Sequence, residues 1–136
     1  MRQELLKQKA SIETALTNDV VIASVGEENS AFANLSASLA EIRRLKGVIG
    51  YIIRSNTSAI IDLEDSDSIF QYAILSSEIH ESSVDISKRF ALGAAESILF
   101  EGENIKVLCL GISDNKISVF MEKSANHAWI IKRILL

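Results

Sequence analysis

Few side chains in this chain of 136 residues could carry out chemistry, and their spacing favours a structural role for them. Cys109 is the single cysteine, and it lies inside an apolar run where a thiol is inert. His80 and His127 have no partner at metal-site spacing, so we expect both at the surface or at an interface. No phosphate-binding loop and no nucleophile elbow occur. We therefore expect no catalytic, cofactor-binding or metal-binding residues, and we predict that the chain is not an enzyme.

The acidic segment 64–67 allows two interpretations. Its carboxylates could bind a cation, but no further ligands follow at the spacing of a calcium-binding loop. Ser68 and Gln71 have the spacing of a capping box, and acidic residues beside a helix N-terminus are stabilised by the helix dipole. The segment therefore predicts the start of a helix near Ser68 rather than a metal site.

Composition and charge exclude several classes of function. The 48% of hydrophobic and 24% of charged residues are typical of a folded soluble domain. A net charge of -4 without a basic patch argues against a nucleic-acid partner. No apolar run approaches the roughly 20 residues of a membrane-spanning helix, and residues 1–9 lack the apolar core of a signal peptide. Together with the lone cysteine, these features predict a cytoplasmic protein without a membrane span.

Apolar periodicity predicts the elements that must position any site. Residues 1–30 are expected to form an N-terminal helical extension with a helix over 3–16, followed by a run over 20–26 that either ends this helix or forms a short strand. The remaining residues, 31–136, are expected to form the main domain. Its elements should be a helix, two strands, a long helix, three strands and a last helix capped by Ser124, over 31–46, 47–54, 59–64, 68–92, 97–100, 104–112, 117–122 and 124–136.

The long helix over 68–92 carries two apolar strips. The first is expected to cover the sheet and contains Tyr72, Leu75, Ile79, Ile86 and Phe90. The second contains Phe70, Ala73, Ile74, Ser77 and Val84. Either the helix has a wide core face, or one strip covers the sheet while the second meets another subunit.

The order of elements over 31–136 resembles the roadblock family, which contains dynein roadblock light chains and MglB-like regulators of small GTPases. The matching segments are 45–53, the long helix after the acidic segment, and 105–112 with its hairpin into 117–121. Gly47, followed by a branched residue and then by Gly50, is the most recognisable piece. The chain departs from the family in its first hairpin, where Asn56-Thr57-Ser58 replaces a common Asp-Gly and alters the turn geometry.

The resemblance implies an α+β, profilin-like fold: a five-stranded antiparallel sheet with the long helix on one face and the terminal helices on the other. It also implies a homodimer in which the long helices pack together and the strands over 97–100 pair. No cofactor is implied. The expected dimer or partner interface consists of Phe70, Ala73, Ile74, Ser77, Val84, Ile98 and Phe100.

Three functions remain open at this point. The leading hypothesis, implied by the resemblance, is a non-enzymatic homodimeric regulator or scaffold that binds a Ras-like small GTPase. The first alternative is a profilin-like small-ligand sensor module of the PAS or GAF type, which would need a polar-lined pocket between sheet and helix. The apolar central strands favour a filled core instead. The second alternative is an assembly subunit whose residues 1–30 bind a partner.

Overall fold

The computed structural model describes residues 20–22 and 30–136. The helix predicted over 3–16 lies outside these residues. The described elements follow the predicted order, and a short strand precedes them. They are β1 (Val20–Ile22), α2 (Ser30–Ile42), β2 (Val48–Arg54), β3 (Ala59–Leu63), α3 (Ile69–Arg89), β4 (Ser97–Glu101), β5 (Ile105–Ile112), β6 (Asn115–Glu122) and α4 (His127–Leu135).

One antiparallel sheet contains all the described strands, in the order β1-β3-β2-β6-β5-β4. Strands β2 to β6 are the five that the sequence predicts. β2 and β5 are internal, as their apolar character on both faces requires. The ambiguous run over 20–26 contributes β1, which pairs with β3 and adds a sixth strand from the segment predicted as an extension. β4 is therefore one edge of the sheet and β1 the other.

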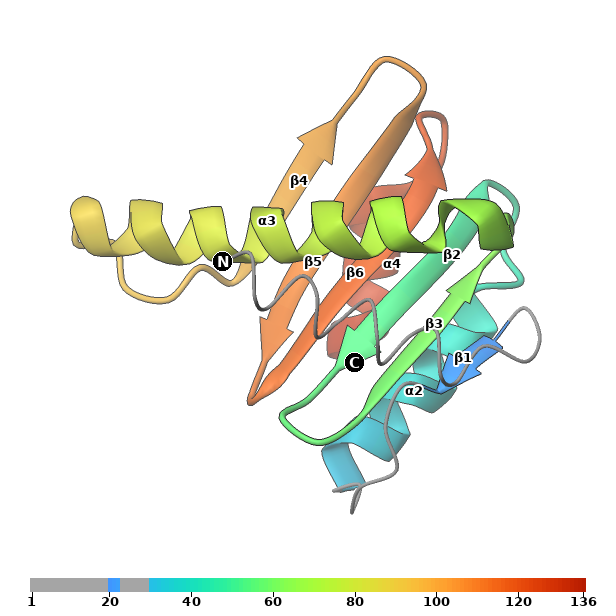
Figure 1. Ribbon diagram of the computed structural model, residues 1–136, viewed down its shortest axis with the longest axis horizontal. Helices are drawn as coiled ribbons and strands as arrows, with labels where there is room; N and C mark the ends of the chain where they lie inside the picture. The colour runs from blue at the N-terminus through green and yellow to red at the C-terminus, as the bar shows by residue number, and fades with distance from the viewer. Residues whose placement is uncertain (1–19, 23–29) are drawn as a thin grey trace.

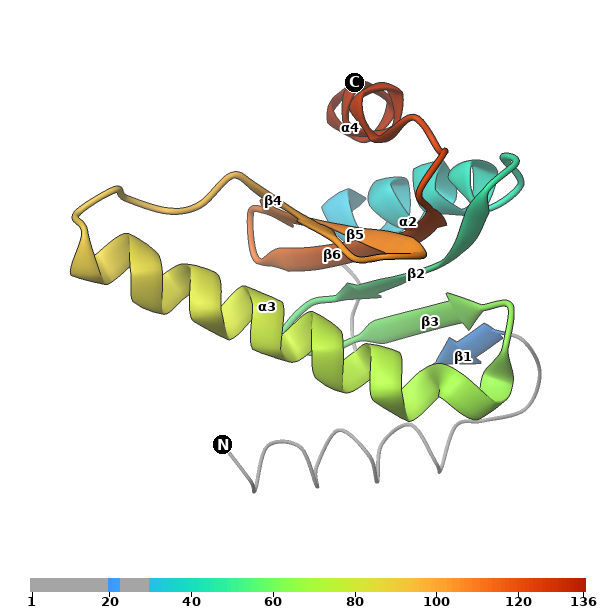
Figure 2. The ribbon, with the colours of Figure 1, turned by 90° about the horizontal axis from the view of Figure 1, so that it is seen from above.

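The sheet lies between two helical layers, as predicted, with α3 on one face and α2 and α4 on the other (Figure 2). Each face has its own apolar core. On the side of α2 and α4, Phe32, Leu39 and Ile130 pack against Leu108 and Val119. On the side of α3, the residues that form the core are Ile52, Ile61, Leu63, Ile69, Ala73, Ile79, Val107, Cys109 and Phe120.

Two glycines shape the start of β2. Gly47 has a φ of +90°, a backbone conformation that other residues adopt only with strain. At Gly50, an added Cβ would lie 2.6 Å from Leu63 Cδ2 and 2.7 Å from Leu63 Cα, so β3 leaves no room for a side chain. The glycine pattern that carries the sequence resemblance therefore has two separate causes, a turn and a close approach between strands.

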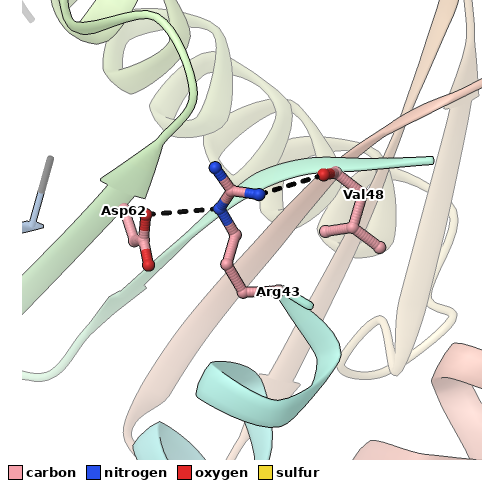
Figure 3. A network of polar contacts seen from close by, with 3 residues as sticks. All are labelled: Arg43, Val48 and Asp62. Atoms are coloured by element: carbon pink, nitrogen blue, oxygen red, sulfur yellow. Dashed lines mark hydrogen bonds and ion pairs between the residues drawn. The ribbon is translucent and has the colours of Figure 1, made fainter. Parts of the chain in front are cut away.

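Arg43 fixes the connection between α2 and β2 onto the sheet (Figure 3). Its Nε donates to Asp62 Oδ1 on β3 over 3.3 Å, and its Nη1 donates to the Val48 carbonyl oxygen over 3.2 Å. Both ends of the ion pair are largely shielded from solvent. One side chain thus joins a helix end to two neighbouring strands.

The long helix starts where the sequence predicts, with Ser68 at the N-cap position of α3, but the Ser68 side chain makes no capping hydrogen bond, and the predicted cap of α4 is wrong. The Ser68 side chain does not cap α3; it donates to Asp65 Oδ2, and Asp65 instead caps a short 3-10 turn, Ser66–Ser68, by accepting from the Asp67 N–H. At α4 the cap is Asn126, whose side chain accepts from Trp129 N over 3.0 Å, rather than Ser124. At both helix starts a side-chain oxygen accepts a backbone N–H, but the acceptor belongs to Asp65 or Asn126 and not to the predicted serine.

Candidate functional site

The side of α3 that faces the sheet is a row of mostly small or polar residues. Ile69, Ala73, Ser76, His80 and Ser87 are all buried, and they recur every three or four positions, with one gap of seven. This row lies between the two predicted apolar strips and includes Ala73 of the second strip. The other residues of each strip lie on the two flanks of the helix. Small side chains in the row allow α3 to lie close to the strands.

The first strip was predicted as core, and its C-terminal part is not. Tyr72, Leu75 and Ile79 do pack on the sheet, with the Tyr72 ring centroid 4.7 Å from that of Phe120. Ile86 and Phe90, in contrast, are 50% and 65% exposed. The last turns of α3 extend past the β4 edge of the sheet, so none of the described strands lies beneath them (Figure 1).

The residues predicted for an interface fall into three groups. Ala73 and Ser77 are only 8% and 7% exposed within the single chain, so they offer little surface to a partner. Phe70 and Ile98 are half-buried in the core under α3. Ile74, Val84 and Phe100 are exposed.

An apolar groove of about 540 Å³ lies between α3 and β4. It brings Ile98 and Phe100 of β4 together with Ile86 of α3 and with Leu92, which follows the helix. Ile74 and Val84 do not line it. Periodicity alone could not find this groove, because Ile86 was assigned to the core and Leu92 follows the last turn of α3.

A polar cluster lies inside the core between α3 and the sheet. Ser118 Oγ on β6 is 2.6 Å from Ser76 Oγ, 3.3 Å from His80 Nε2 and 3.3 Å from Cys109 Sγ. The prediction that His80 lies at the surface or at an interface is therefore wrong: it is buried, because its position falls on the sheet-facing row. The serine hydroxyls give its ring a partner there.

Burial controls the titration of this cluster. Burial, together with the positive charges of Arg54 and Lys116, lowers the pKa of His80 to about 4. Burial also raises the pKa of the Cys109 thiol, against the opposing effect of the Ser118 hydrogen bond. At neutral pH the histidine is therefore uncharged and the thiol is protonated, which agrees with the expected inert character of Cys109.

A second cavity, of about 650 Å³, opens on the other flank of α3. It lies between the C-terminal half of α3, the connection over 91–95 and the hairpin between β5 and β6. His80 and Cys109 reach it from the polar cluster, and Asn115 lines its wall. The apolar central strands predict a core without a cavity. The structure differs at the C-terminal half of α3, where this cavity separates the helix from the β5–β6 hairpin.

Among residues 20–22 and 30–136, no group of three or more His, Cys, Asp or Glu side chains could hold a metal ion. Within the same residues, no helix is both long and apolar enough to cross a membrane.

Comparison with solved structures identifies the fold. A Roadblock/LC7 domain from Streptomyces avermitilis superposes with a TM-score of 0.60 at 15% identity, covering 81% of this chain and 90% of that domain. The chain has the roadblock fold. The gliding protein MglB from Thermus thermophilus superposes with a TM-score of 0.63 at 9% identity, covering 81% of this chain and 87% of MglB. No family sequence profile and no curated protein sequence matches the chain.

The roadblock fold gives the groove a definite place in the architecture. The groove lies at the β4 edge of the sheet, beside the end of the long helix. The sequence resemblance selected the same helix and the same strand for an interface. The residues that the structure brings together there are Ile86, Leu92, Ile98 and Phe100, of which Ile86 and Leu92 were not among the predicted interface residues.

Proposed function

We propose that this chain is a non-enzymatic regulator or scaffold that acts as a homodimer and binds a Ras-like small GTPase. The observation that carries the proposal is the apolar groove beside an unpaired strand edge on a roadblock fold. Ile86, Leu92 and Phe100 are each at least half exposed there. Apolar groups gathered in this way on a soluble domain mark a site of protein association.

A second copy of the chain is the occupant that best fits this edge. β4 pairs with β5 alone among the described strands, so its outer backbone groups have no strand partner. Antiparallel pairing with β4 of a second copy would satisfy them and would cover Phe100. The exposed Ile74 and Val84 and the half-buried Phe70 would extend the interface along α3, while Ala73 and Ser77 would support it from within.

The GTPase would bind across the paired long helices, as the roadblock resemblance implies. Any stimulation of hydrolysis would be indirect, with the chain holding the GTPase's own catalytic residues in place. An inserted arginine can raise the rate by ~1,000-fold or more, but Arg89, the only arginine of α3, lies in its last turn and pairs with Asp85 over 2.9 Å. Its position favours a structural role over a catalytic one.

The test is capture of small GTPases of the same genome, each loaded with GDP or with a non-hydrolysable GTP analogue. We expect at least one to bind the full-length chain preferentially in one nucleotide state. Trp129→Ser is the control substitution and should leave this binding unchanged, because Trp129 is an exposed aromatic residue of α4, on the face of the sheet opposite to α3. The proposal fails if no GTPase binds in a nucleotide-dependent way.

A further inference from the structure

The outer side of α4 combines exposed apolar residues with positive charges. Ile130 and Ile134, four positions apart, are buried in the core and fix which side of α4 faces the sheet. On the outer side, Trp129 is 46% exposed and Leu135 is 62% exposed. α4 contains no acidic residue. The exposed residues that we call the α4 surface are Trp129, Lys132, Arg133 and Leu135.

Two turns beside α4 add further positive charge. One follows α2 and contains Arg44 and Lys46, and the other precedes α4 and contains Lys123. The two turns are joined, because the Glu122 N–H donates to the Gly47 carbonyl oxygen over 2.7 Å. All three cations are exposed, and none of them forms an ion pair within the described residues. They are therefore available to a negatively charged partner.

The two sides of the molecule differ in charge. In the segments 30–47 and 122–136 the acidic residues are Glu41 and Glu122 alone, and Glu41 is paired with Arg133 over 2.7 Å. On the other side, the exposed acidic residues of α3 are Glu78, Glu81 and Asp85. With the acidic segment 64–67 they outnumber the basic residues in the last turn of that helix. A negatively charged surface would therefore repel the α3 side and attract the α4 side.

The shape of the α4 side suits a flat partner. α4 is the outermost element of its layer (Figure 2), and both cavities described above lie beside α3 instead. A single exposed helix can lie along a bilayer, with tryptophan and leucine at the level of the headgroups and lysine and arginine on the lipid phosphates. Lys132 lies between Trp129 and Leu135, three positions from each. Lysine is depleted at the centre of protein–protein interfaces, so its place favours a lipid surface over a protein.

We propose that the α4 surface and the two turns bind the surface of an anionic lipid bilayer. Trp129 and Leu135 enter the headgroup region, while Lys132 and the cations of the turns contact lipid phosphates. The contact leaves α3 and the β4 edge accessible. This inference goes beyond the proposed function and requires neither a GTPase nor a dimer, so each can fail without the other.

Co-sedimentation of the full-length chain with lipid vesicles tests the charge requirement. The probes are vesicles of phosphatidylcholine alone and vesicles of phosphatidylcholine with an equal amount of phosphatidylglycerol. We expect the chain to bind the anionic vesicles at least about tenfold more tightly, and to lose this preference at high salt. Equal binding to the two kinds of vesicle, or binding to neither, overturns the proposal.

Trp129 reports which side of the molecule contacts the bilayer, because it is the single tryptophan of the chain. Its fluorescence emission should shift to shorter wavelength on addition of anionic vesicles, and lipids with brominated acyl chains should quench it. Binding to vesicles without either change would place the contact on another face and overturn the proposal. A glutamate-rich peptide is the probe for an acidic protein. If the peptide shifts the emission and the vesicles do not, the partner is a protein and the proposal is wrong.

Substitutions on the two sides give the matched comparison. Lys132→Gln should weaken vesicle binding about fivefold, and Trp129→Ser, followed by co-sedimentation, at least about fivefold. Lys88→Gln and Phe90→Ser remove an exposed lysine and an exposed aromatic residue at the end of α3, and they should leave binding unchanged. All four residues are exposed, and circular dichroism checks that each variant folds. Equal losses on the two sides overturn the proposal.

Discussion

The hydroxyl oxygens of Ser76 and Ser118 lie 2.6 Å apart and join the long helix to the middle of the sheet. Ser118 is fully buried, and it also contacts His80 and Cys109. Around these four residues the core is apolar, with Val107 and Phe120 on the neighbouring strand positions. A polar cluster in such surroundings is stabilising only while every member keeps its partner.

We expect Ser118→Ala to lower the free energy of unfolding by about 1–3 kcal/mol, because Ser76 and His80 would lose a buried partner. Urea denaturation followed by circular dichroism measures the change. Ser36→Ala is the control: Ser36 donates only to the Phe32 carbonyl within α2, so its loss should cost about 0.5 kcal/mol or less. Equal effects of the two substitutions would contradict a special role for Ser118.

His80 makes stability depend on pH. The folded-state pKa is about 4 and the ordinary value is 6.5, so between these values the unfolded chain binds more protons. Stability is therefore fully present above pH 6.5 and falls as the pH is lowered toward 4. We expect a loss of about 1 kcal/mol between about pH 7.5 and pH 5.5, before most carboxylates titrate. Urea denaturation at each pH measures it, and His80→Gln should remove most of the slope; an unchanged slope would exclude His80 as its source.

Gly50→Ala should destabilise the fold by about 1–3 kcal/mol, because the new methyl group would overlap Leu63 on the adjacent strand. Gly111→Ala is the matched control in β5, where the nearest atom to an added Cβ is the Ala95 carbonyl oxygen at 4.0 Å. Thermal unfolding compares the two variants. A Gly50→Ala variant as stable as the control would show that β3 can move away at little cost.

Arg43→Met should lower stability by about 1–2 kcal/mol, because Asp62 and the Val48 carbonyl would both lose a charged donor in a shielded place. Arg89→Met removes an ion pair whose two side chains are 66% and 68% exposed, and it should change stability by about 0.5 kcal/mol or less. Chemical denaturation of both variants gives the comparison. The prediction is wrong if the exposed pair costs as much as the shielded one.

Phe100→Glu and Ile86→Glu should each shift the chain from dimer to monomer, because each would place a charge in the proposed apolar contact. Light scattering after size exclusion at micromolar concentration measures the mass. Trp129→Glu, on the opposite face, should remain dimeric. Ile74→Glu tests how far the contact extends along α3. An unsubstituted chain that runs as a monomer would remove the basis for the dimer.

Much of the fold could be predicted because each element carries its own local signal. The apolar runs of β2 and β5 indicate internal strands, and the stripe of Phe32, Leu35, Leu39 and Ile42 indicates one covered helix face. Strand β1 was less certain, since a run of three paired residues has no periodicity of its own. Its pairing with β3 depends on a neighbour distant in the sequence.

The orientation of α3 could not be predicted from apolar periodicity. The two apolar strips flank the row that faces the sheet, and this row contains serines and a histidine, which a search for apolar positions does not detect. Their burial is favourable because Ser118, 42 positions after Ser76, supplies the partner. The exposure of Ile86 likewise depends on how far the helix extends beyond β4, which no local pattern records.

The order of the elements and the internal position of β2 and β5 could be predicted from the amino-acid sequence, because apolar periodicity is a local property. Three features could not be predicted: which side of α3 meets the sheet, which apolar residues stay exposed at the β4 edge, and which polar side chains meet Ser118 in the core. These features depend on distances between residues far apart in the chain, and packing alone sets those distances.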